Sequence, residues 1–188
     1  MLELLAPAGN LDAVIAAVQN GADAVYMGFG DGFNARRSAD NFTQESFAKA
    51  VRYCHIRGCK VYVTLNTLVG DREMDAAAAL AQQASDAGAD AILVQDLGLA
   101  RVLRAALPDT PLHASTQMSI HNLAGVEAAA EMGITRAVLA RELSLEQIRF
   151  ISQHASIETE VFVHGALCFC YSGQCYMSAL IGRRSGNR

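Results

Sequence analysis

The stretch Lys60-Val61-Tyr62-Val63-Thr64-Leu65-Asn66 is a run of β-branched and aromatic residues, the types most common in strands. An Ala-rich segment over residues 75–86 follows it, Gly88 ends that segment, and a second apolar run begins at Ala91. Continuous apolar strands are typical of a parallel sheet whose two faces are both covered. This part of the chain therefore predicts a strand, a crossover helix and a second, parallel strand.

The same unit recurs along the whole chain. Amphipathic segments separate the apolar runs, and several begin at a capping residue and end at Gly or Pro. Strands are predicted at 2–6, 24–29, 60–66, 91–95, 112–116, 136–140 and 159–163, and helices at 10–20, 43–57, 75–86, 97–107, 122–132 and 144–154. Seven strands alternating with six helices predict an α/β fold of the (β/α)8 TIM-barrel type that lacks its last unit. The alternative, an open doubly wound sheet, fits less well because no G-x-G-x-x-G follows the first strand.

Composition limits the classes of function. The 188 residues, 52% of them apolar, fit one barrel-like domain over 1–188 or a fragment of a somewhat larger one. A net charge of −4 argues against tight non-specific binding of duplex nucleic acid, although a local arginine cluster remains compatible with RNA. The sequence has neither a signal peptide nor an apolar run of ~20 residues, which predicts a cytoplasmic protein with reduced thiols and no membrane association.

Polar side chains follow the predicted strands, at the end of a barrel where catalytic groups gather. They are Asn66, Gln95, Asp96, Ser115, Thr116, Gln117, Arg141, Glu142 and His164, with His121 nearby and with Arg36 and Arg37 in the loop after the second strand. Some have simpler explanations. Asp96 also fits a helix N-cap, and Arg141 and Glu142 fit a local ion pair.

Three of the five cysteines, Cys168, Cys170 and Cys175, lie within eight residues after the last predicted strand. Thiolates at such a position suit an iron–sulfur cluster. His164 and the three cysteines also supply four donors for zinc, and Cys168 with His164 four residues earlier resembles a nucleophile pair. Spacing alone leaves these alternatives open. Cys54 and Cys59 lie near a predicted helix end and are expected to be packing residues.

The segment Glu160–Ser178 reads E-x-F-x-x-G-A-L-C, four residues, and then G-x-C-x-M-S. This pattern resembles the signature of peptidase family U32, the collagenase-like proteases. The resemblance extends over the whole chain. It includes Leu5-Ala6-Pro7-Ala8-Gly9, Gly21-Ala22-Asp23-Ala24-Val25-Tyr26, Ser115-Thr116-Gln117-Met118 and Ala140-Arg141-Glu142-Leu143.

The resemblance implies chemistry that the family name does not. Better understood relatives are oxygen-independent hydroxylases of tRNA, ribosomal RNA and ubiquinone precursors. They carry a [4Fe–4S] cluster on four cysteines, and prephenate is the implied oxygen donor of the RNA enzymes. By this resemblance Cys168 and Cys175 are the first two ligands, Cys170 is additional, and the other two ligand positions fall beyond Arg188. The resemblance thus implies that residues 1–188 are the N-terminal part of a longer chain.

The sequence therefore predicts an iron–sulfur-dependent hydroxylation enzyme acting on RNA or a small aromatic ring. The alternatives are a collagenase-like peptidase using a metal or Cys168, and a non-catalytic scaffold that binds RNA or a partner. The expected catalytic residues are His164, Arg141, Glu142, Gln117 and Asn66. The expected substrate-binding residues are Arg36, Arg37, Ser115, Thr116, Asp96, Arg183 and Arg184. The guanidinium groups of the four arginines suit phosphate or a dicarboxylate. Unpaired edges of the first and last strands would favour a homo-oligomer.

Overall fold

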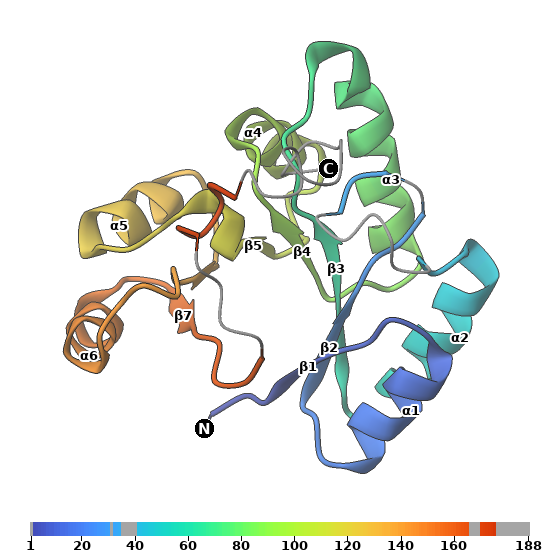
Figure 1. The fold of residues 1–188 in the computed structure, drawn as a ribbon. Coiled ribbons are helices and arrows are strands. Elements are labelled where there is room, and N and C mark those ends of the chain that lie inside the picture. Colours follow the sequence, from blue (N-terminus) through green and yellow to red (C-terminus); the bar gives the residue numbers. More distant parts are fainter. Residues whose placement is uncertain (1, 31, 35–40, 166–169, 176–188) are drawn as a thin grey trace.

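The computed structural model describes residues 2–30, 32–34, 41–165 and 170–175 (Figure 1). In these residues seven strands form one sheet in chain order, and every neighbouring pair is parallel. The strands are β1 (Leu5–Pro7), β2 (Ala24–Met27), β3 (Lys60–Leu65), β4 (Ala91–Val94), β5 (Leu112–Ala114), β6 (Arg136–Val138) and β7 (Glu158–Glu160). The sheet forms a half-barrel with β1 and β7 at its edges, so the predicted fold class is confirmed. The association expected through these edges stays a prediction.

A helix follows each of the first six strands on the outer side of the sheet (Figure 1). The helices are α1 (Leu11–Gln19), α2 (Gln44–His55), α3 (Met74–Asp86), α4 (Leu97–Ala106), α5 (Leu123–Glu131) and α6 (Leu145–His154). Two short 3-10 helices, η1 (Asp71–Glu73) and η2 (Thr116–Met118), precede α3 and α5. No helix among the described residues combines the length and apolar composition needed to cross a membrane.

Local sequence explains where the helices begin and end. Five of the helices start at a side-chain cap that accepts a backbone N–H, and Ser144 and Gln147 form the predicted capping box at α6. Gly133 follows α5 with a φ of 79°, a conformation that costs other residues free energy. A Cβ at this position would also lie 2.5 Å from Cδ of Arg104, so both backbone and packing favour glycine.

Several strands are shorter than the apolar runs predicted. The fifth was expected over 112–116, but it ends at Ala114 because Ser115 caps η2 and Thr116 begins it. Likewise β6 ends at Val138, although Leu139 and Ala140 remain buried. Burial of apolar side chains thus continues past the paired strand, and the chain turns into loops that form the carboxyl end of the half-barrel.

The two faces of the sheet differ in character. Side chains that point outward, such as Val61, Val63 and Ile92, pack under the helices in the larger apolar core. Those that point inward form a smaller apolar cluster that includes Tyr62 and Leu93. The inner face therefore leaves room for polar groups at both ends of the half-barrel.

Arg136 organises the amino-terminal end, which we call the floor. Its guanidinium donates to Glu158 Oε2 over 2.6 Å and to Glu3 Oε1 over 2.5 Å, and Tyr62 donates its hydroxyl to the same Glu3 oxygen over 2.8 Å. Burial alone would raise the pKa of Glu3, but hydrogen bonds from Arg136, Tyr62 and Lys60 lower it to about 2. The floor therefore joins the segment before β1 to β6 and β7 through ionised groups.

Candidate functional site

The carboxyl ends of β3, β4 and β5 bring several of the predicted site residues together. Asn66 Nδ2 donates to Ser115 Oγ over 3.1 Å, and Gln95 Nε2 donates to the carbonyl oxygen of Gln117 over 3.4 Å. Thr116 donates its hydroxyl over 3.4 Å to a carbonyl oxygen in the loop after β6. The strand ends thus form one connected polar surface, which we call the mouth of the half-barrel.

Ser119 occupies an unusual backbone conformation beside this surface. It has a φ of 58°, in the left-handed region that residues other than glycine seldom adopt. Its hydroxyl donates to the carbonyl oxygen of Ser172, and its own carbonyl oxygen lies 2.7 Å from His121 Nδ1. These contacts offset the cost of the backbone conformation, which is about 1 kcal/mol or more.

Ser172 anchors the cysteine turn, residues 170–175, at the mouth. Its side chain is 1% exposed, and its Oγ accepts a hydrogen bond from Arg141 N over 3.2 Å. Its backbone N–H donates to the carboxylate of Glu142. The loop after β6 therefore holds both the hydroxyl and the backbone N–H of Ser172, and through this contact Glu142 positions the turn.

Gly173 brings the same turn against the loop after β5. It has a φ of 75°, and a Cβ at this position would collide with the carbonyl oxygen of Gln117 and lie 2.7 Å from Ser119 Oγ. Only glycine permits this approach. Cys175 follows two residues later and is partly buried, so its Cα lies within about 7 Å of that contact along the chain. The turn thus places a thiol at the mouth.

The other predicted residues of the mouth take varied roles. Asp96 caps α4, because its Oδ1 accepts from Leu99 N over 2.8 Å and its Oδ2 from Val69 N over 3.3 Å. Arg141 is exposed, and its guanidinium lies 5.8 Å from the ring centroid of Phe162. The salt bridges of the described residues do not join Arg141 to Glu142.

Further predicted residues either lie apart or fall outside the structure. His164 is exposed in the segment after β7. Arg36, Arg37, Cys168, Arg183 and Arg184 lie outside the described residues. Within the part that is described, no group of three His, Cys, Asp or Glu side chains has the geometry of a metal site. The predicted cluster and zinc ligand sets both include Cys168, so both stay predictions.

A pocket of about 600 Å³ opens between the mouth, α5 and the cysteine turn. Its polar lining includes Gln95, Gln117, His121 and Gln174, and its apolar lining includes Leu68, Leu97, Met118, Ile120 and Met132. Sequence reasoning named Gln117 as a site residue but gave no role to Gln95, His121 or Gln174. The position of Gln95 at the end of a strand and that of Gln174 inside the motif were the available signals.

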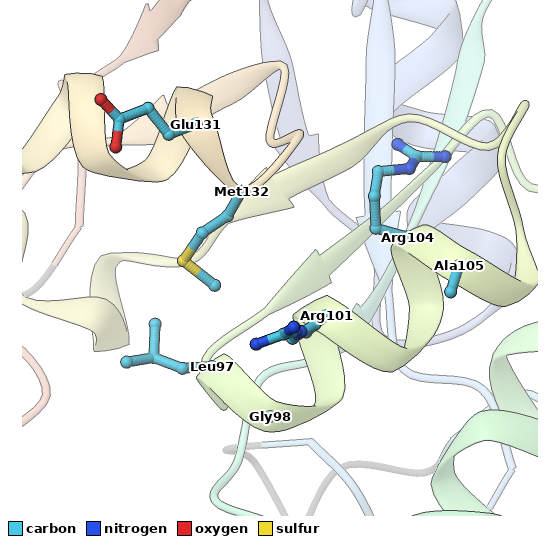
Figure 2. A pocket seen from close by; sticks show the side chains of 7 residues that line it. All are labelled: Leu97, Gly98, Arg101, Arg104, Ala105, Glu131 and Met132. Carbon is cyan, nitrogen blue, oxygen red and sulfur yellow. The ribbon is translucent and has the colours of Figure 1, made fainter.

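A second pocket, of about 680 Å³, lies on the outside between α4 and α5 (Figure 2). It shares Leu97 and Met132 with the first pocket, and Arg101 and Glu131 also line it. The guanidinium of Arg104 is already committed to main-chain carbonyl oxygens, at 3.3 Å from Gly133 O among others. Strand-end groups are missing from its lining, so this pocket is the less suitable of the two for chemistry.

The two remaining cysteines are buried. Cys54 and Cys59 are 0% and 2% exposed. Burial raises the pKa of Cys54 to about 12 and also raises that of Cys59. Both thiols are therefore protonated at neutral pH, and their expected role in packing is confirmed.

Comparisons with known proteins find one matching family and several similar proteins. The model of the family described as Peptidase family U32 matches residues 9–188. The chain is 44% identical over 187 residues to the 23S rRNA 5-hydroxycytidine C2501 synthase of Escherichia coli (strain K12), covering 100% of this chain and 28% of that protein. It is 41% identical over 186 residues to the tRNA hydroxylation protein P1 of Bacillus subtilis (strain 168), covering 99% and 44%. It is 34% identical over 198 residues to a collagenase of Porphyromonas gingivalis (strain ATCC BAA-308 / W83), covering 99% and 47%.

The chain spans less than half the length of these three curated relatives. Among solved structures, the U32 peptidase Mk0906 aligns with a TM-score of 0.73 and 18% identity, over 90% of this chain and 71% of that one. The DHDPS from Cyanidioschyzon merolae aligns with a TM-score of 0.55 and 14% identity, over 82% and 60%. At such identities these structures support the fold alone.

Proposed function

Because the chain belongs to peptidase family U32, as its cysteine motif predicted, we propose that it takes part in the hydroxylation of a base in RNA. One observation carries the proposal. The chain is 44% identical along its whole length to a protein named for 5-hydroxycytidine synthesis in 23S rRNA, and 41% identical to one named for tRNA hydroxylation.

The pocket at the mouth suits a single base. Its volume of about 600 Å³ falls in the usual range for small-molecule sites, and its lining combines apolar walls with a few amides and an imidazole. Enzymes that act on a base of RNA take it from a loop or extrude it from the stack, and read its edge with hydrogen bonds. The exposed guanidinium of Arg141 at the same end of the half-barrel would contact a phosphate or a carboxylate.

Cys168 and Cys175 would hold an iron–sulfur cluster, with further ligands from outside these 188 residues. The donor chemistry fits, because thiolates are the ligands that such clusters require and the turn carries Cys175 to the mouth. When bound, the cluster would supply one-electron chemistry. The described residues would bind the base and surround it with apolar side chains, while Ser172 and Glu142 hold the cysteine turn in place.

The test compares RNA from cells that carry the gene with RNA from cells that lack it. We expect one or more nucleosides to gain the mass of a single oxygen atom only when the gene is present, and to lose it on Cys175→Ser substitution. If the nucleoside masses are the same in both strains and the purified protein cleaves gelatin, a peptidase is favoured, the function that the collagenase relative suggests. RNA crosslinking without any mass change would favour a scaffold. Either result would overturn the proposal.

A further inference from the structure

Gln95 stands out among the groups that line the pocket at the mouth. It follows β4 directly, it is 7% exposed, and its Nε2 donates to the carbonyl oxygen of Gln117. Its Oε1 is buried and accepts no hydrogen bond from the described residues. A buried acceptor without a donor costs about 1–3 kcal/mol, so this oxygen is a strong candidate to meet a donor on a ligand.

Three neighbouring polar groups of the pocket, on Ser119, His121 and Asn122, are already engaged. Ser119 donates its hydroxyl to Ser172 O, and Asn122 Oδ1 accepts from Gly125 N over 2.7 Å as the cap of α5. His121 Nδ1 lies 2.7 Å from Ser119 O, so that nitrogen carries the proton and donates it. These groups stabilise the pocket itself, whereas Gln95 Oε1 has acceptor capacity left for a ligand.

The chemistry of Gln95 favours one kind of base edge. Since its Nε2 is held by Gln117 O, the amide presents an oxygen, which pairs with an N–H donor and is repelled by a carbonyl oxygen. Cytosine carries an exocyclic amine where uracil carries a carbonyl oxygen. Because Gln95 lines the pocket, its amide lies at the wall that a bound base would contact.

We propose that Gln95 accepts a hydrogen bond from the exocyclic amine of the bound base, and so makes this pocket select cytosine over uracil. The inference rests on the proposed function in that it takes the ligand to be a base of RNA. It adds the residue that reads the base and the direction of the preference. Apolar side chains on either side, among them Met118 and Ile120, would hold the ring.

The experiment measures binding, so it does not depend on hydroxylation. Cytidine, uridine and N4,N4-dimethylcytidine, which keeps the cytosine ring but lacks the amine hydrogens, are titrated into the 188-residue chain by NMR or calorimetry. We expect cytidine to bind about tenfold more tightly than either of the other two, because they cannot donate to Gln95. Equal affinities for the three nucleosides, or no binding of any, would overturn the inference.

A variant then tests the residue. Gln95→Met keeps the approximate volume and removes both polar atoms, and we expect the preference for cytidine to fall to within about twofold while affinity for uridine is retained. Gln153→Met, the same change at an exposed position on α6, should keep the full preference. A preference that survives in Gln95→Met would sink the assignment even if RNA is hydroxylated. Lack of hydroxylation with an intact cytidine preference would instead count against the proposed function alone.

Discussion

The guanidinium of Arg136, on β6, lies 2.5 Å from the carboxylate of Glu3, a residue that precedes β1 and is 133 positions earlier in the chain. Their contact spans the floor of the half-barrel, where no backbone hydrogen bond joins β1 to β6. Glu158 completes the arrangement by accepting from the same guanidinium over 2.6 Å. The two ends of the sheet are therefore tied by side chains.

Removing this guanidinium should destabilise the protein strongly. Arg136→Met would leave partly buried Glu3 with Lys60 as its remaining cation, and breaking one side of such a buried pair costs about 3 kcal/mol. Urea denaturation followed by circular dichroism measures the loss. Arg149→Met, at an exposed site on α6, is the matched control and should change stability by less than about 0.5 kcal/mol. A loss of stability in Arg136→Met as small as that in Arg149→Met would show that this ion pair adds nothing to the free energy of unfolding.

Acid should weaken the fold through His113. Its side chain is 4% exposed, and burial together with the charge of Arg136 lowers its pKa from 6.5 to about 3. Between these values the unfolded chain binds a proton that the folded chain does not, so stability is lost as the pH falls through this window. Glu3, with its pKa lowered to about 2, adds a loss that begins near its ordinary value of 4.5. We expect wild type to lose about 3 kcal/mol more than His113→Asn between pH 7 and pH 4 in denaturation experiments.

A methyl group at Gly173 should displace the cysteine turn. Gly173→Ala places Cβ against Gln117 O and Ser119 Oγ in a backbone conformation that alanine disfavours. We expect faster proteolysis within the turn, with little change in the melting of the barrel. Gly9→Ala is the control, since a Cβ there would meet nothing within 4 Å. Wild-type protease resistance in Gly173→Ala would contradict the docking described.

Thiol reactivity should separate the cysteines by location. Cys54 and Cys59 are buried with raised pKa values, whereas Cys175 is partly exposed at the mouth. Each unit of pKa above the working pH lowers the thiolate fraction tenfold, so Cys54 should react at least about 100-fold more slowly than Cys175. Alkylation of the native, metal-free protein followed by peptide mass spectrometry gives the rates. Comparable rates at the two sites would require the native fold to open readily around α2.

Local sequence patterns were sufficient for most of the fold. Strand and helix positions follow from apolar periodicity, and caps such as Ser144 and Asn122 are readable from residue type and spacing. The contacts that join distant segments were not readable in this way. Nothing near Arg136 or Glu3 in the sequence specifies their pairing, although a charge within an apolar strand was a signal that it needs a buried partner.

The candidate site, too, was only partly predictable from the sequence. Placing polar residues at strand ends correctly brought Asn66, Ser115 and Gln117 together, because parallel strands expose their carboxyl ends on one side. The role of Ser172 as an anchor depends on the loop after β6, 30 residues away, and on the left-handed backbone at Ser119. Such roles are properties of the tertiary structure and have no local signature.

The floor and the mouth lie at opposite ends of the half-barrel and are held by separate sets of residues. Distant sites with no shared partners change free energy nearly independently, so replacement of side chains at the mouth leaves the ties between Arg136, Glu3 and Glu158 intact. Substitutions can therefore accumulate at the mouth while the floor keeps the half-barrel folded. This separation permits divergence at one end of the fold, which agrees with relatives named as differently as collagenase and 23S rRNA 5-hydroxycytidine synthase.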